Sequence, residues 1–103
     1  MTRVVYYIDD SEFSIYAKGH AGFADIGNDI VCAGISTLLQ TLVAYMDTDD
    51  YMIENGELWC YGNGSNVICA DMVIKGLRLL EEQFPDHIRV IEGCTIHRDF
   101  TLI

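Results

Sequence analysis

A histidine and a cysteine near the start of the chain could together carry out nucleophilic chemistry. His20 could act as a general base and Cys32 as a thiol nucleophile, twelve residues further on. The segment between them contains Gly22 and Gly27, at which the backbone can turn sharply. The thiol falls where a helix is expected to begin. That position stabilises a thiolate, because free N–H groups and the helix dipole favour an anion.

Two neighbouring side chains could support this pair. Asp29 is a good helix N-cap residue; it could also orient His20 or a loop N–H group, as the third member of a catalytic triad does. Ser36 lies one turn after Cys32, as either a helix-surface residue or a hydrogen-bond partner for the thiolate or substrate. We expect backbone N–H groups at the helix start to form an oxyanion hole.

The remaining cysteines and histidines are the alternatives to this pair. Cys69 also opens a predicted helix, but it lies on an apolar stripe and is predicted to belong to the core. Cys60 lies within a predicted strand, and nothing beside Cys94 resembles a catalytic group. His87 and His97 are rival bases, although no sequence signal brings either of them near the candidate nucleophile. Residue types alone would favour structural roles for all of these groups.

The length and composition predict one folded domain, residues 1–103, with a substantial core. Half of the residues are apolar and 21% are charged. No apolar run approaches the roughly 20 residues of a membrane span. The first ten residues resemble a strand rather than a signal peptide. We therefore expect a cytoplasmic protein with reduced thiols and no membrane partner.

The charge and the cysteine spacing exclude two further classes of site. The formal net charge is −10, from sixteen acidic and six basic residues, which argues against direct nucleic-acid binding. Such an acidic surface would suit a basic protein partner, and solubility explains it equally well. The four cysteines contain no CxxC pair, so we expect no zinc site, and no cofactor is indicated.

The residue pattern predicts the element order β-β-α-β-β-α-β. We expect strands over 3–8, 13–17, 51–54, 58–61 and 88–91, and helices from Asp29 to about Met46 and from Ser65 to about Phe84. Asn55-Gly56 is a strong signal for a tight hairpin turn. Residues 95–103 are either a sixth edge strand or an extended tail. The fold class is therefore α+β, a sandwich of two helices on a small mixed sheet.

Apolar stripes on the two helices are predicted to face this sheet. They are Val31, Ile35, Leu38, Leu42 and Met46 on the first helix, and Cys69, Val73, Leu77, Leu80 and Phe84 on the second. Cys32 lies beside the first stripe, on the same flank as Ser36 and Gln40. The thiol is therefore expected to point toward a more polar surface.

The segment around the candidate pair resembles one known family. Gly19-His20-Ala21, followed by Gly27-Asn28-Asp29-Ile30-Val31-Cys32-Ala33-Gly34-Ile35-Ser36, is similar to the motif of the ribosomal-processing cysteine proteases called Prp, including phage or prophage members. The chain length and element order also fit, so the resemblance covers most of the chain. Two departures are Gly34, where many relatives have alanine, and a longer tail after Gly93. Glycine within a helix costs roughly 1 kcal/mol relative to alanine, which would loosen the turn that holds the thiol.

The resemblance implies a function and a set of site residues. Cys32 would be the nucleophile, His20 the base, Asp29 and Ser36 supporting residues, and Gly19, Ala21, Gly22 and Gly27 the substrate-binding loop. Relatives are cytoplasmic homodimers that act without metal through an acyl-enzyme. They remove a short N-terminal extension from a large-subunit ribosomal protein, cutting after paired aromatic residues. Phage relatives would trim capsid or scaffold proteins instead.

Other functions fit the same residues. The fold could serve as a non-catalytic peptide-binding module in which Cys32 is packed and the loop grips a peptide. The same dyad could also serve a thiol-dependent acyl transferase or thioesterase. The loop between base and nucleophile controls whether they meet. We therefore expect His20 and Cys32 to lie beyond hydrogen-bond distance without substrate.

Overall fold

Five strands and two helices follow one another in the predicted order within residues 1–25 and 27–94, the part of the chain that the computed structural model describes. They are β1 (Thr2–Ile8), β2 (Glu12–Lys18), α1 (Ile30–Met46), β3 (Tyr51–Glu54), β4 (Glu57–Asn63), α2 (Asn66–Gln83) and β5 (Ile88–Glu92). Their bounds differ from the predicted ones by at most two residues. The element expected over 95–103 lies outside the described residues.

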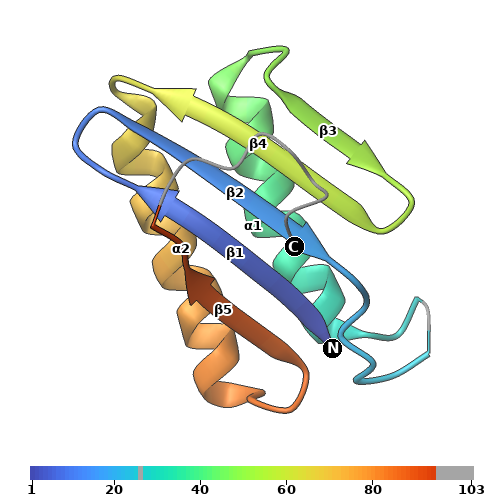
Figure 1. Cartoon of the computed structure of the whole chain (residues 1–103). Coiled ribbons are helices and arrows are strands. Elements are labelled where there is room, and N and C mark those ends of the chain that lie inside the picture. Colours follow the sequence, from blue (N-terminus) through green and yellow to red (C-terminus); the bar gives the residue numbers. More distant parts are fainter. Residues whose placement is uncertain (26, 95–103) are drawn as a thin grey trace.

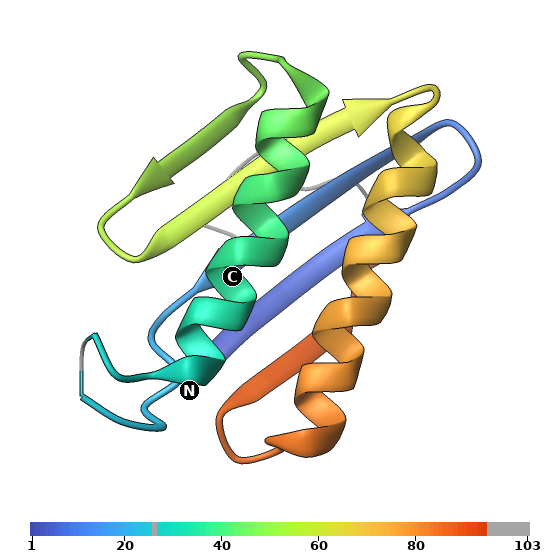
Figure 2. The same cartoon turned by 180° about the vertical axis from the view of Figure 1, so that it is seen from behind.

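The strands form one mixed sheet in the order β3-β4-β2-β1-β5. Neighbouring strands are antiparallel except β1 and β5, which run parallel. Helices α1 and α2 lie side by side on one face of this sheet (Figures 1 and 2). The predicted α+β sandwich is confirmed. Asn55 and Gly56 both have positive φ, 48° and 78°, as a type I′ hairpin turn requires.

The topology brings several chain segments together at one end of the sheet, which we call the loop end. Lys18 at the end of β2 pairs with Arg3 near the start of β1 and with Glu57 at the start of β4. Ile88 at the start of β5 pairs with Thr2. Helix α1 also begins here, after the loop that leaves β2 (Figure 2). Residues far apart in the sequence can therefore meet around the first turn of α1.

The core lies between the sheet and the helices, and it differs in part from the predicted stripes. The helices bury Val31, Ile35, Leu39, Leu42, Val43 and Met46 from α1, and Ala70, Val73, Ile74 and Leu77 from α2. Four residues of the predicted stripes are only half-buried and pack against the edge of the core, namely Leu38, Cys69, Leu80 and Phe84. The predicted stripes face the sheet alone, whereas each helix also packs against the other helix.

Leucines packed over glycines form the contact between the two helices. A Cβ atom added at Gly76 of α2 would lie 3.1 Å from the methyl groups of Leu38, and one added at Gly34 of α1 would lie 3.3 Å from a methyl group of Leu80. An alanine at position 34 would therefore fit only if the Leu80 side chain moved by a few tenths of an ångström. Within the described residues, no helix has both the length and the apolar character needed to cross a membrane.

Candidate active site

The Asp29 carboxylate fixes both the start of α1 and the loop before it. One oxygen, Oδ1, accepts hydrogen bonds from the N–H groups of Val31 (3.0 Å) and Cys32 (2.9 Å). The other, Oδ2, accepts from Phe23 (2.9 Å) and Ala24 (3.4 Å). The Cys32 N–H, together with those of the two loop residues, holds the pKa of this carboxyl below its usual value of 3.8. Asp29 thus caps the helix and also binds loop N–H groups, and it makes no bond to His20 among the described residues.

We expect Asp29→Asn to separate these two duties. An asparagine oxygen still caps the helix, but its NH₂ group cannot accept from Phe23 and Ala24, so peptide cleavage should fall by about 10-fold or more while melting changes little. Asp29→Ala should lower both the cleavage rate and the melting temperature.

Because its pKa is lowered in the folded protein, the Asp29 carboxylate stabilises the fold at pH values above the usual carboxyl pKa. That contribution is lost as the pH falls from the usual carboxyl pKa through the lowered one. Melting temperatures from pH 6 to 3 should therefore fall more steeply in the wild type than in Asp29→Asn. Equal cleavage by Asp29→Asn and the wild type would contradict this role.

Cys32 lies in the first turn of α1 and is half-buried. Its sulfur accepts a hydrogen bond from the backbone N–H of Ala21, with 3.1 Å between N and Sγ. Ala21 is itself almost fully buried, with 1% of its surface exposed. A hydrogen-bond donor aimed at a sulfur stabilises its charged form. The loop therefore delivers a backbone donor to the thiol.

His20 is exposed on the other side of the same loop, beside the β3–β4 turn. The Gly19 N–H donates to the carbonyl of Gly56 (3.1 Å), and a Cβ atom added at Gly56 would lie 3.6 Å from His20 Nε2. Gly19 has φ of +95°, and a Cβ atom there would lie 2.8 Å from the Met1 carbonyl oxygen, so only glycine fits. Among the described residues, no hydrogen bond joins the His20 ring to the Cys32 sulfur, as expected for the free protein.

Cavities on both sides of the thiol meet at His20, Cys32 and Ser36 within the part of the chain that the structure describes. The hairpin cavity, about 360 Å³, extends toward the β3–β4 turn over the apolar side chains Ala17, Ile35, Leu39, Ile53 and Leu58. The loop cavity, about 310 Å³, extends along Gly22, Ala24, Gly27 and Asp29. Gly22 and Gly27 have φ of +72° and +92°. The predicted site residues Cys32, His20, Asp29, Ser36, Gly19, Gly22 and Gly27 therefore line one two-sided cleft.

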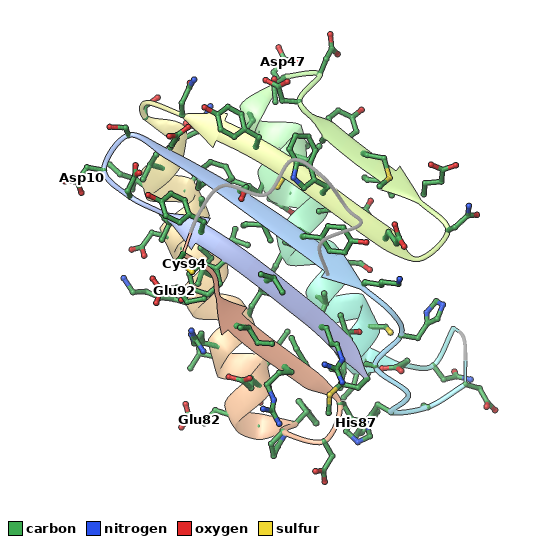
Figure 3. All side chains as sticks on the ribbon, viewed as in Figure 1. Asp10, Asp47, Glu82, His87, Glu92 and Cys94 are labelled. Carbon is green, nitrogen blue, oxygen red and sulfur yellow. The ribbon has the colours of Figure 1, made fainter. Side chains whose placement is uncertain are left out.

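His87, one of the two rival bases, also belongs to this neighbourhood, although no local sequence signal predicts its position there. Its Nδ1 lies 3.0 Å from the carbonyl oxygen of Ala21. Its ring meets the Phe23 ring edge-on, with centroids 5.4 Å apart. Figure 3 shows His87 at the loop end of the sheet, where α2 gives way to β5. The parallel pairing of β5 with β1 places it there, and that pairing cannot be read from local patterns.

The expectation of free N–H groups at the helix start was wrong for residues 31 to 33. Asp29 Oδ1 accepts from Val31 and Cys32, and the Asp29 carbonyl accepts from Ala33 at 3.0 Å. The same carboxylate that starts the helix occupies the donors that an oxyanion would need.

The other cysteines lie in different surroundings. Cys60 is fully buried in β4, and that burial raises the pKa of its thiol to about 12. Cys69 is half-buried, and Cys94 is exposed. None of them accepts a loop N–H in the described part of the chain, whereas Cys32 does.

We expect iodoacetamide to alkylate Cys32 at pH 7 at least about 10-fold faster than Cys94, because Cys32 lies in the first turn of a helix and its sulfur accepts the Ala21 N–H. Cys60 should react slowest, since it stays protonated and buried. His20→Ala should slow the reaction at Cys32 alone. Peptide mapping of the four alkylation rates measures this. Equal rates at Cys32 and Cys94 would contradict an activated thiol.

The chain is similar to one family of known proteins. Residues 1–89 match the family model described as cysteine protease Prp. The ribosomal processing cysteine protease Prp of Mycoplasma genitalium is 34% identical over 92 residues, which cover 82% of this chain and 93% of that protein.

Solved structures share the fold. A Staphylococcus aureus ribosomal processing protease Prp, in complex with a covalently linked product peptide, superposes with a TM-score of 0.76 at 22% identity, covering 90% of this chain and 100% of that one. The S. aureus protease with a substrate peptide gives a TM-score of 0.66 at 18% identity, again over 90% and 100% of the two chains. The family match and the mycoplasma relative extend over most of the chain, and so this chain belongs to the Prp family of cysteine proteases.

Proposed function

We propose that this chain is an endopeptidase that removes a short N-terminal extension from a protein of the large ribosomal subunit, with Cys32 as nucleophile and His20 as base. The observation that carries the proposal is the two-sided cleft. The hairpin cavity and the loop cavity extend in different directions from Cys32 and His20. An endopeptidase must hold its substrate on both sides of the scissile bond, and the two cavities offer one binding region for each side.

The mechanism follows from the positions of these groups. The Cys32 thiolate attacks the scissile carbonyl carbon, and its electron pair forms the new C–S bond. The carbonyl electrons move to oxygen and then return, expelling the amine, which His20 protonates. His20 next takes a proton from water, whose oxygen attacks the thioester and releases the carboxylic acid and the Cys32 thiolate, which leaves His20 protonated for the next leaving amine. His20 must first turn from the Gly56 side toward the sulfur, since apo geometry often lacks the catalytic hydrogen bond.

The lining of the cleft is compatible with the substrate that the family resemblance implies. The apolar floor of the hairpin cavity can take aromatic side chains preceding the scissile bond. Glu54 and Glu57 lie at its rim, where only Lys18 is a neighbouring cation among the residues that line it. A negative rim and a net charge of −10 favour approach of a basic ribosomal protein. The names of the mycoplasma and S. aureus relatives, which are ribosomal processing proteases, support the same substrate class.

Incubation of the purified chain with the host's ribosomal protein precursors tests the proposal. Mass spectrometry should show one large-subunit protein losing a short N-terminal peptide, with the cut after an aromatic pair. Intact ribosomal precursors together with a trimmed capsid or scaffold protein would assign the chain to phage assembly instead. The resemblance also implies a cytoplasmic homodimer, and sedimentation equilibrium should return twice the 11.6 kDa chain mass.

A further inference from the structure

Both backbone polar groups of Ala21, the N–H and the carbonyl oxygen, make hydrogen bonds beside the Cys32 thiol. The N–H donates to Cys32 Sγ at 3.1 Å, and the carbonyl oxygen lies 3.0 Å from His87 Nδ1. A carbonyl oxygen only accepts hydrogen bonds, so Nδ1 of His87 carries the hydrogen in this contact. The side chain of His87 thus fixes the residue whose N–H faces the sulfur.

His87 is itself firmly anchored. Its N–H donates to the Phe84 carbonyl at 2.9 Å, and its carbonyl accepts from the Thr2 N–H at 3.0 Å. Phe23 packs edge-on against both the His87 ring (5.4 Å) and the Phe84 ring (5.3 Å), which ties the loop to the end of α2. The stick view in Figure 3 places His87 between α2 and β5 at this end of the molecule.

A donor aimed at the sulfur is well placed for the oxygen of a reacting carbonyl. When Sγ bonds to a carbonyl carbon, the developing oxyanion lies next to the sulfur, within reach of a donor that already approaches it. Oxyanion donors act at about 2.7–3.1 Å. The amides of residues 31 to 33, at the helix start, are already bonded to Asp29. The Ala21 N–H needs only to exchange the sulfur for the oxygen.

We propose that the Ala21 N–H is an oxyanion donor of this enzyme and that His87 is the residue that positions it. The inference rests on the proposed function, because it concerns the acyl-transfer step at Cys32. It assigns His87 a role that does not involve proton transfer, unlike that of His20.

Two variants of His87 can separate the effect of its Nδ1–H donor from the effect of its ring packing against Phe23. His87→Phe keeps an aromatic ring against Phe23 but has no donor. His87→Asn places an amide NH₂ near the position of Nδ1. With the p-nitrophenyl ester of acetylated diphenylalanine, His87→Phe should lower kcat by about 10-fold or more with KM within about twofold, and His87→Asn should recover most of the loss.

Alkylation by iodoacetamide distinguishes a role in stabilising the oxyanion from a merely structural role of His87. The reaction of iodoacetamide with the thiolate displaces iodide from carbon and forms no oxyanion. Alkylation of Cys32 in His87→Phe should therefore slow by a clearly smaller factor than ester turnover, because alkylation loses only the contact of the Ala21 N–H with the sulfur. Equal losses in both reactions would mean that His87 serves the thiol or the fold, and would overturn the proposal. So would unchanged kcat in His87→Phe, or no recovery in His87→Asn.

Removal of the N–H itself is the second test. The full chain can be assembled by ligating residues 1–31 to a segment that begins with Cys32, with an ester in place of the amide at residue 21. Loss of one oxyanion donor costs about 10²–10³-fold in kcat, and we expect a loss of that size here. Ester-variant turnover equal to that of the synthetic wild type would overturn the proposal. If the wild-type chain hydrolyses neither the p-nitrophenyl ester substrate nor any ribosomal precursor, the proposed function itself is refuted.

Discussion

Cys32→Ala should lower cleavage of the ribosomal precursor by at least about 10⁴-fold and leave folding intact, because it removes the nucleophile and every step that follows. The side chain is half-buried at the edge of the core, and its hydrogen bonds are to the Ala21 N–H and to the Asp29 carboxylate. The melting temperature should change by no more than about 4 °C. Initial rates with the precursor, together with thermal melts, measure both effects.

Cys69→Ala is the matched control for this substitution. Cys69 is also a half-buried thiol in the first turns of a helix, and it packs against the core. Its truncation should cost about 1 kcal/mol of stability while cleavage continues. Cleavage by Cys32→Ala at a rate near that of the wild type would contradict the assignment of the nucleophile.

His20→Ala should lower kcat by about 10²–10⁴-fold, because proton transfer to the leaving amine then has no positioned acid. The side chain is exposed beside Gly56, so the free energy of unfolding should stay nearly unchanged. His20→Gln offers a hydrogen bond without a transferable proton and should be equally inactive. Steady-state rates of the two variants, compared with their melting curves, decide this. Turnover within about threefold of the wild type would transfer the role of base to another group.

The local parts of the fold followed from the sequence, and the long-range parts did not. The Asn55-Gly56 turn and the Asp29 cap are signalled by adjacent residues, and both appear where predicted. The predicted cap residue Ser65 precedes α2, although its side chain makes no capping bond. Leu38 was misplaced because helix periodicity does not reveal that a second helix lies alongside the first.

The candidate site shows the same division. Asp29, Cys32 and Ser36 lie on one short stretch, and helical spacing was enough to place them together. The contact of His87 with Ala21 depends on the parallel pairing of β5 with β1, which connects residues 66 positions apart. The occupied N–H groups of residues 31 to 33 were missed for a different reason. The Asp29 carboxylate, which predicts the helix start, also accepts hydrogen bonds from Val31 and Cys32, and the Asp29 carbonyl accepts one from Ala33.

The acyl-enzyme on Cys32 is the most direct test of the proposed mechanism. The chain should be mixed with a synthetic peptide that spans the extension and the cleavage site, quenched in acid within milliseconds to seconds, and digested. Mass spectrometry should find the N-terminal fragment of the substrate attached through a thioester to the peptide that contains Cys32, and His20→Ala should form less of it. Cleavage without an acyl group on Cys32, or with the acyl group on Cys60, Cys69 or Cys94, would contradict the proposed mechanism.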